Sequence, residues 1–600
     1  MASFHPATLV VDEVDLTRPS LQAENVTVGA AHAICSIEDN VVSFEEYLYY
    51  AGMARSKEQQ ENARFVAARG PRTFKNIIKG RFAKGGTVTQ SPNDIVTHEK
   101  RGEKGNHATS EFPKSTPRHA VTAAQKETAN RALRTAGWGN IFYLVTTDIL
   151  GPMSSPWAFA QLGYGPGVAL YSLFGLMSYY SGWILWKVFL ALDSDKYPVR
   201  GYGDYFSRIF GPRARHFINV AQSIQLLLLV SVQILSNGQS ISQISRGPSG
   251  DNMGICFVAC PLIFMTAGLI LGQIRTLQRL GWLASFSVWL TIILCIIILV
   301  SAGYGPNYAA VEASFGLPPG MPIQKFAGTP PPGLATGGIG LIGSLNGLNL
   351  AVYAYGGSML FAALLAEMRH PVDFWKSLLI AEITIYSIYM FFGIFLYSYH
   401  GQYAYNPAVQ GISVYSIQTA ANILNVISNL IPTVLYGNIG LKVVYIEVFH
   451  ELFGFPELNT RTGKIWWAAL APVYWAIAFI IGASVPQFSY ISGLVGALFI
   501  LSFTYTFPAW LAIGFWIKKD AMIEGEERFD TTTSSYLYVD QGWKRWKRGF
   551  LKKPLFNTLN IIYFLGALVT CTLGCYSSIV SLRQAFEGDI ANSLSCTPPL

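Results

Sequence analysis

Long apolar stretches follow one another from about residue 138 to residue 582, and short polar connections separate them. A helix needs about 20 consecutive apolar residues to cross a bilayer. By this criterion the sequence predicts an all-α, polytopic membrane domain over residues 138–582, with eleven transmembrane helices. The predicted spans cover residues 138–163, 165–191, 216–243, 254–271, 279–303, 337–367, 375–399, 420–446, 465–484, 488–517 and 556–582.

Two of these spans contain residues in their middle that disfavour a helix. Span 1 contains Gly151-Pro152-Met153-Ser154-Ser155-Pro156, and span 6 contains Tyr355-Gly356-Gly357-Ser358. Proline removes a backbone donor and glycine weakens a helix, so each interruption leaves unpaired amides and carbonyls at the depth of the bilayer. Such groups are tolerated only where they line a cavity or are buried in protein. A matched pair of interrupted spans is typical of a secondary transporter's binding site.

The two interrupted spans occupy corresponding places in the chain. A stretch rich in proline and glycine, from Gly303 to Gly338, separates the first five spans from the next five, and we predict that it is an external loop. Because five is an odd number, the two groups of five would cross the membrane in opposite orientations. The spacing therefore predicts a 5+5 inverted repeat, followed by one further span.

The positive charges predict the orientation. With the N-terminus inside, the predicted inner connections hold twenty Lys and Arg residues and the outer ones hold three. Cytoplasmic connections are normally enriched in these residues, so we predict a cytosolic N-terminus and a short, non-cytosolic tail over residues 583–600. The net charge of +8 is spread beside the apolar spans, which favours contact with anionic membrane lipids over binding of nucleic acid.

The first 137 residues are polar and carry several charged clusters. We predict a largely disordered cytosolic tail with one helix near residues 43–67. The N-terminus lacks a basic start followed by an apolar core, so the first span is expected to direct insertion itself. The plasma membrane is the expected residence, and the vacuolar or another internal membrane is the alternative.

Composition and motifs argue against a soluble protein and against an enzyme. Hydrophobic residues make up 51% of the chain and charged residues only 13%, against about 25% in soluble domains. The seven cysteines form neither a disulfide ladder nor a close CxxC pair, so we predict that they are small buried apolar residues. No HExxH cluster, phosphate-binding loop or GxSxG elbow is found, and we expect no metal and no cofactor.

Three motifs, in order and in the right spans, resemble those of the amino acid/auxin permease family. They are the run Gly151 to Gly163 in span 1, the run Tyr355-Gly356-Gly357 with the later Glu367 to Phe374 in span 6, and the run Gly493 to Ala509 in span 10. The resemblance covers about residues 130–582. It implies a LeuT-like fold and symport of amino acids or related small carboxylates, commonly driven by protons. The long tail and the style of the sequence look fungal.

The sequence departs from the family pattern at Pro152 and at Ser155, where a leucine is usual. Substrate identity is therefore the property that transfers least from the resemblance.

The broken segments are expected to bind the substrate backbone. In span 1, the amides from Gly151 to Ser155 would face a carboxylate, and the hydroxyls of Thr147, Ser154 and Ser155 would add donors. In span 6, the carbonyls from Tyr355 to Gly357 would accept from an ammonium group, while Tyr353 or Tyr355 closes over the side chain. The alternatives are a proline kink packed by its neighbours in span 1 and a Gly356-Gly357 pair used only for close helix packing in span 6.

Two charged residues are candidates for ion coupling. Asp148 lies one turn before the break in span 1, and an intramembrane carboxylate is by default a functional candidate. Lys442 follows Asn438 late in span 8, and the resemblance places it opposite the first half of span 1, where it would pair with Asp148 and replace a sodium ion. We therefore expect coupling to protons rather than to sodium. The alternatives are a structural carboxylate and a lysine that reaches the membrane interface.

Further polar residues lie within the spans. Gln225, Gln233 and Asn237 form a stripe on span 3, which would line the substrate path or join helices. Glu382 in span 7 would relay protons or form a structural pair. We expect Gln233 in span 3 and Asn438 in span 8 to contribute to selection of the substrate side chain.

These features together predict an alternating-access carrier for an amino acid, with proton symport. A neutral substrate is expected because few intramembrane charges are left to pair with an ionic side chain. Two alternatives stay open at this point. One is a carrier-like amino acid sensor that signals through its tail, and the other is an ion channel.

Overall fold

The computed structural model describes residues 42–69, 134, 136–247, 254–273, 281–338, 340–458, 460–484, 488–523, 525–527, 529–530, 535–587 and 596. Most of the predicted N-terminal tail, Cys35 and most of the predicted C-terminal tail lie outside these residues. The helix predicted near residues 43–67 is present as α2 (Phe44–Arg69).

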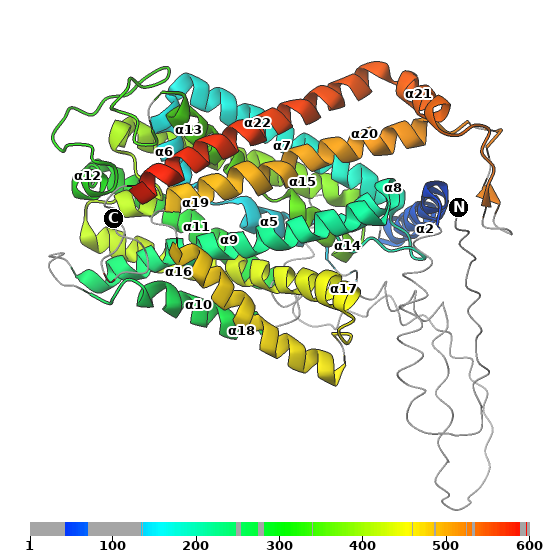
Figure 1. Cartoon of the computed structure of the whole chain (residues 1–600), viewed down its shortest axis with the longest axis horizontal. Helices are drawn as coiled ribbons and strands as arrows, with labels where there is room; N and C mark the ends of the chain where they lie inside the picture. The colour runs from blue at the N-terminus through cyan, green and yellow to red at the C-terminus, as the bar shows by residue number, and fades with distance from the viewer. Residues whose placement is uncertain are drawn as a thin grey trace, which may run out of the picture.

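Long helices lie side by side along the long axis of the molecule (Figure 1). Within the described residues, nine helical segments are long and apolar enough to cross a membrane. The broken segment over residues 138–162 and the short apolar helix α10 (Ala259–Gly272) correspond to predicted spans 1 and 4. The all-α, multi-pass architecture is thus confirmed, while the count of eleven and the inverted repeat stay predictions.

The helices of the bundle are α5 (Trp138–Ile149), η1 (Pro152–Ser154), α6 (Ser155–Leu162), α7 (Tyr164–Leu192), α9 (Pro212–Arg246), α10, α11 (Gly281–Ser301), α13 (Leu341–Ala354), η4 (Ser358–Leu360), α14 (Phe361–Glu367), α15 (Phe374–His400), α16 (Tyr415–Val443), η8 (Val444–His450), α17 (Glu451–Phe453), α18 (Arg461–Ser484), α19 (Phe488–Val495), η9 (Gly496–Ile500), η10 (Ser502–Thr506), α20 (Phe507–Asp520) and α22 (Pro554–Glu587). Short 3-10 turns η3 (Ala302–Tyr304), η5 (Pro371–Asp373), η6 (Gly401–Tyr403) and η7 (Ala408–Gly411) lie at helix ends and in connections.

Both predicted breaks are present. In span 1, helix α5 ends at Ile149, and the chain becomes helical again only at Pro152, the first residue of η1. In span 6, helix α13 ends at Ala354 and η4 begins at Ser358. Each interruption coincides with the proline or glycine residues that disfavour a helix.

A third irregular span was not predicted. Between α19 and α20, span 10 runs through two π-helical segments, η9 and η10. A π-helical turn contains one extra residue, and such turns occur frequently at functional sites. Here the irregular turns carry Ile500 and Thr504, which face the break in span 6.

The halves of the broken spans share some neighbours and differ in others. Helix α15 packs against both halves of span 1, α5 and α6, while α6 also packs against α13. Helix α9 packs along α16, α18 and α10. The start of span 1 also meets the end of span 6, because the Ala136 amide donates to the Glu367 carbonyl at 3.1 Å and the Arg369 amide donates to the Ala136 carbonyl at 2.9 Å. These contacts hold the start of span 1 beside the end of span 6.

Smaller elements cover the two ends of the bundle (Figure 1). One end, here called the α2 end, carries α2, α8 (Tyr202–Phe210), α21 (Trp543–Lys552) and a hairpin of β1 (Phe529–Asp530) and β2 (Ser535–Tyr536). The other, here called the α12 end, carries α12 (Tyr308–Phe315) and the end of α22. The charge pattern predicts that the α2 end is cytosolic.

The prediction for the cysteines is wrong at two positions. Cys256 and Cys596 form a disulfide across a sequence separation of 340 residues. They meet because the chain returns to the start of α10, where the Phe257 amide donates to the Cys596 carbonyl at 3.3 Å. Cys260 and Cys295 are buried and unpaired, as predicted, whereas Cys571 and Cys575 are half-buried.

Candidate functional site

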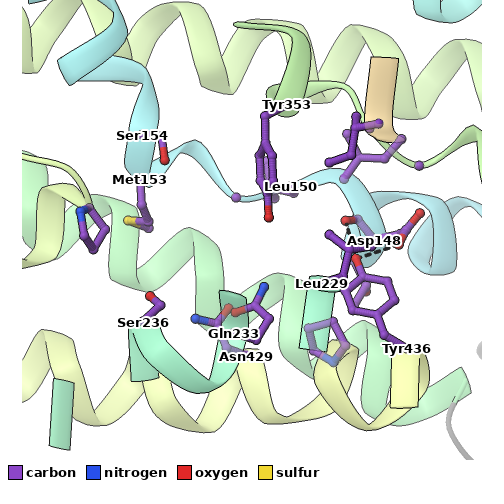
Figure 2. Close-up of a pocket in the computed structure, with 18 of the residues that line it drawn as sticks. Asp148, Leu150, Met153, Ser154, Leu229, Gln233, Ser236, Tyr353, Asn429 and Tyr436 are labelled. Atoms are coloured by element: carbon purple, nitrogen blue, oxygen red, sulfur yellow. Dashed lines mark hydrogen bonds between the residues drawn. The ribbon is translucent and has the colours of Figure 1, made fainter. Parts of the chain in front are cut away.

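A cavity of ≈ 110 Å³ lies between the two breaks. The engineered apolar cavity that admits benzene measures about 150 Å³, so this space suits a small solute. It is lined by Thr147, Asp148, Ile149, Leu150, Gly151, Met153, Ser154, Gln225, Leu229, Gln233, Ser236, Tyr353, Gly356, Gly357, Met359, Tyr389, Pro407, Asn425, Asn429, Pro432, Tyr436, Phe488, Ile500 and Thr504. Residues from both broken spans, from α9 and from α16 therefore meet around one space (Figure 2).

Tyr389 of α15 stabilises the break in span 1. Its hydroxyl donates to the Ile149 carbonyl at 2.9 Å and accepts from the Gly151 amide at 3.0 Å. The Gly151 amide, predicted to face a carboxylate, is therefore already engaged. The first amides of a helix have no acceptor within a full α-helical turn, and η1, whose residues Met153 and Ser154 line the cavity, begins at this point.

The three predicted hydroxyls of span 1 differ in position. Thr147 and Ser154 line the cavity, and the Thr147 hydroxyl lies 2.8 Å from the Tyr143 carbonyl and 2.9 Å from the Ala284 carbonyl of α11. Ser155 is buried away from the cavity and donates to the Pro152 carbonyl at 2.8 Å. Ser155 thus stabilises the first turn of the second half-helix.

In span 6, Tyr353 lines the cavity and Tyr355 does not. The two side chains lie two residues apart near the end of α13, so they project to different sides. The Tyr355 ring packs instead among other phenols, 6.2 Å from the Tyr171 ring and 5.8 Å from the Tyr389 ring. Of the two tyrosines predicted to cover a substrate, only Tyr353 is in place (Figure 2).

Gly356 and Gly357 allow the broken segments to approach each other. A Cβ atom at Gly356 would overlap the Ile500 side chain of η9. A Cβ atom at Gly357 would lie 2.5 Å from both Asp148 Oδ2 and Ile149 Cγ1. The glycine pair therefore lets the break in span 6 contact both span 1 and span 10, in addition to ending the helix.

Asp148 is the single charged residue among those that line the cavity in the described part of the chain. Its Oδ1 accepts from the Tyr436 hydroxyl of α16 at 2.7 Å. Its Oδ2 is buried and has no hydrogen-bond partner. A buried carboxylate oxygen without a partner is costly, and it provides a ready acceptor for an ammonium group or a proton.

Lys442 and Asn438 do not line the cavity. Both are on α16 beyond Tyr436, which faces the cavity. At about 100° per residue, Asn438 is rotated by about 200° and Lys442 by about 240° from Tyr436. Lys442 interacts electrostatically with Glu367 at the end of span 6, and the hydrogen bond to the Asp148 side chain comes from Tyr436. The predicted Asp148–Lys442 pair is thus replaced by Asp148–Tyr436.

A polar wall faces the breaks from α9 and α16. Figure 2 shows Gln233, Ser236 and Asn429 across the cavity from Met153 and Ser154. The Asn429 amide group donates to the Asn425 side-chain oxygen at 3.0 Å. Of these residues only Gln233 was predicted as a substrate ligand.

The stripe on span 3 is present only in part. Gln225 and Gln233 line the cavity, and Gln225 is 3% exposed with its Oε1 lacking a partner. Asn237 lies outside the lining and its amide group donates to the Gln233 carbonyl at 2.8 Å. The part of the polar wall on α16 was not predicted. The spacing of Asn422, Asn425 and Asn429 by three and four residues, which places them on one face of the helix, is the sequence signal that could have revealed it.

A bundle of apolar helices around a buried polar cavity, with two spans broken where they border it, defines an integral, multi-pass membrane protein of the carrier class. A family model described as transmembrane amino acid transporter protein matches residues 134–532. The chain belongs to this family of amino acid transporters.

Individual relatives agree with this assignment. A protein named transmembrane transporter from Fusarium pseudograminearum is 21% identical over 77% of this chain and 87% of its own length. The N amino acid transport system protein of Neurospora crassa is 23% identical over 77% of this chain and 88% of its own length. Lysine histidine transporter-like 8 of Arabidopsis thaliana is 23% identical over 61% of this chain and 69% of its own length. The expected family is thereby confirmed, and two of these three relatives are fungal proteins.

Proposed function

We propose that this protein is a carrier that moves a neutral amino acid across a membrane by alternating access and proton symport. The observation that carries the proposal is the meeting of two broken helices and one buried carboxyl group at a single small cavity. Broken helices present their own peptide groups to a zwitterion, and a buried carboxyl group can accept a proton.

The cavity supports one orientation of the substrate. Its carboxylate would bind at the start of the second half of span 1, where the amides of Met153 and Ser154 and the positive helix end favour an anion. Its ammonium group would lie against the carbonyls near Gly356, which leaves Asp148 Oδ2 to the coupled proton. Its side chain would then point toward the polar wall that contains Gln233 and Asn429.

The lining residues support a neutral side chain. Among the described residues, neither lysine nor arginine borders the cavity, and Asp148, the single acidic residue there, is reserved for the coupled proton. The amide and hydroxyl groups of Gln233, Ser236 and Asn429 favour substrates whose side chains form hydrogen bonds without carrying charge. We propose the plasma membrane as the residence of the carrier, with the α2 end in the cytosol.

Asp148 is proposed to bind the coupled proton. Tyr436 is a neutral partner, so protonation of Asp148 keeps the neighbouring hydrogen bond available while it removes an uncompensated charge. Lys442 is not needed for this role, since it interacts with Glu367 instead.

Uptake by purified protein in liposomes tests the proposal. We expect saturable accumulation of a labelled neutral amino acid when the outside is acidic, and no accumulation from a sodium gradient alone. Asp148→Asn should abolish accumulation, because the amide cannot bind and release a proton. Asp373→Asn is the matched control, since Asp373 pairs with Lys376 away from the cavity. Accumulation driven by sodium and not by acid, or flux that does not saturate, would contradict the proposal.

A further inference from the structure

A second buried carboxyl group lies outside the cavity. Glu382 of α15 is 5% exposed and faces α7, where its Oε1 accepts from the Ser178 hydroxyl at 2.9 Å. Its Oε2 is buried and has no hydrogen-bond partner. A carboxyl group buried at this depth is energetically costly, which makes Glu382 a candidate for a functional role.

Ser178 connects Glu382 to the break in span 6. The Ser178 hydroxyl oxygen lies 3.4 Å from the carbonyl oxygen of Tyr355, the residue that directly precedes Gly356 and Gly357. The hydroxyl has one hydrogen, so it donates either to Glu382 or to Tyr355 at any one time. The choice depends on whether Glu382 is ionised.

An ionised carboxylate only accepts hydrogen bonds, so it attracts the Ser178 hydrogen and leaves the Tyr355 carbonyl without it. A protonated Glu382 donates its own hydrogen to the Ser178 oxygen. The Ser178 hydrogen can then turn to the Tyr355 carbonyl and tie the break in span 6 to α7. One proton thus decides whether this carbonyl is held.

The groups that face Glu382 do not carry competing charge. Tyr355, in the break of span 6, and Tyr505 of η10 interact electrostatically with Glu382. Tyr171 of α7 lies beyond, against the Tyr355 ring, and Tyr563 of α22 bonds to Ser181 one turn along α7. Phenols are neutral at physiological pH, so Glu382 is the group at this position whose charge can change there.

We propose that Glu382 is a second proton-coupling residue, which controls the break in span 6 through Ser178. This inference rests on the proposed function as a proton symporter, but the contact it describes can be tested without transport. The proton would be taken from water on one side of the membrane and returned to water on the other, as span 6 is held or released.

Hydrogen exchange measured by mass spectrometry tests the contact directly. After correction for the intrinsic pH dependence of exchange, we expect amides around residues 354–358 of the wild type to be better protected at acidic than at alkaline pH. Glu382→Gln should give the protected state at every pH, because its amide group also donates to Ser178. Ser178→Ala should remove the pH dependence and leave the carboxyl group in place. Ser387→Ala, whose hydroxyl bonds within α15 on an exposed face, is the control.

Transport measurements then test the coupling. In liposomes, Glu382→Gln should retain exchange of labelled for unlabelled substrate at equal pH and should lose accumulation driven by a pH gradient. If Glu382→Gln does not fold, Ser178→Ala and Glu382→Asp supply the comparison. Wild-type accumulation by Glu382→Gln, or pH-dependent protection that persists in Ser178→Ala, would overturn the inference. Failure of the wild type to transport any amino acid would count against the proposed function. The hydrogen-exchange measurement would still decide whether Ser178 connects Glu382 to the Tyr355 carbonyl.

Discussion

At the scale of single residues, the break in span 1 depends on a phenol from another helix. Tyr389 lies 240 residues from Ile149 in the sequence, yet one hydroxyl group satisfies both sides of the non-helical link. It therefore supplies the hydrogen bonds that the broken helix lost. No periodic pattern in the sequence relates these residues, which is why only the break itself was predictable.

Replacing this hydroxyl group tests its contribution. We expect Tyr389→Phe to lower the free energy of unfolding by about 1–3 kcal/mol, because the buried Ile149 carbonyl loses its partner. Apparent substrate affinity should fall as well, since Leu150 and Gly151 become less well fixed. Denaturant unfolding in detergent and substrate competition measure the two effects. Tyr399→Phe, at an exposed position on the same helix, should leave both unchanged, and an equal loss in the two variants would contradict this role.

The residues of the candidate site were predictable to the extent that chemistry and helix breaks reveal them. The sequence singled out Asp148, Gly151, Gly356 and Gly357, because charge, glycine and proline in an apolar span are unusual. All four line the cavity, while their roles in binding and coupling stay predictions. To predict which of Tyr353 and Tyr355 lines the cavity, one would have to know how the last turn of α13 is rotated about the helix axis. A sequence pattern does not fix that rotation where a helix ends.

At the scale of elements, helix α2 is anchored to the bundle by ion pairs. Asp193, at the end of α7, is fully buried between Arg55 of α2 and Arg134, each with a nitrogen at 2.8 Å from a carboxylate oxygen. Arg545 of α21 also pairs with Glu45 of α2 at 3.1 Å. These contacts join the segment before the first span to the helices that end at the α2 end.

Removing one guanidinium group should loosen α2. We expect Arg55→Ala to cost about 1.5–3 kcal/mol, the typical contribution of a hydrogen bond to a charged group, because Asp193 then keeps only Arg134 and the Val199 amide as partners. Limited proteolysis within residues 44–69, together with thermal unfolding, measures the effect. Arg64→Ala, at an exposed position of the same helix, is the control. Equal protease resistance of α2 in the wild type and Arg55→Ala would contradict the role of Arg55.

The length of the apolar stretches predicted the bounds of most helices, but it did not predict the π-helical turns. Most predicted spans match observed helices within a few residues, because burial in lipid demands a minimum length. The π-helical turns of span 10 contain no proline, and an extra residue per turn leaves little trace in hydropathy. Short helices such as α12 and α21 fall in connections where polarity alone indicated a loop.

At the scale of the whole molecule, the disulfide joins Cys256, just before α10, to Cys596 at the α12 end. Disulfides persist in oxidising compartments, so this bond agrees with the predicted non-cytosolic position of that end. Parity and spacing of cysteines gave no hint of it, since seven cysteines allow many pairings and these two are far apart in the sequence.

Cysteine labelling tests this orientation. In intact cells, we expect a membrane-impermeant maleimide to label Cys256 in a Cys596→Ser variant and to leave the wild type unlabelled at this site until it is reduced. Cys260 is buried and serves as the internal control. Labelling of Cys256 only after the membrane is permeabilised would place the α12 end in the cytosol and contradict the predicted topology.

The anchoring of α2 has a practical consequence for anyone who wishes to shorten this chain for crystallisation. Cutting just ahead of the first span, at about residue 134, would remove Arg55 while Asp193 stays buried. Excising part of residues 70–133 instead would keep both guanidinium groups in the polypeptide. The safer place to trim is thus the middle of the tail and not its junction with the membrane domain.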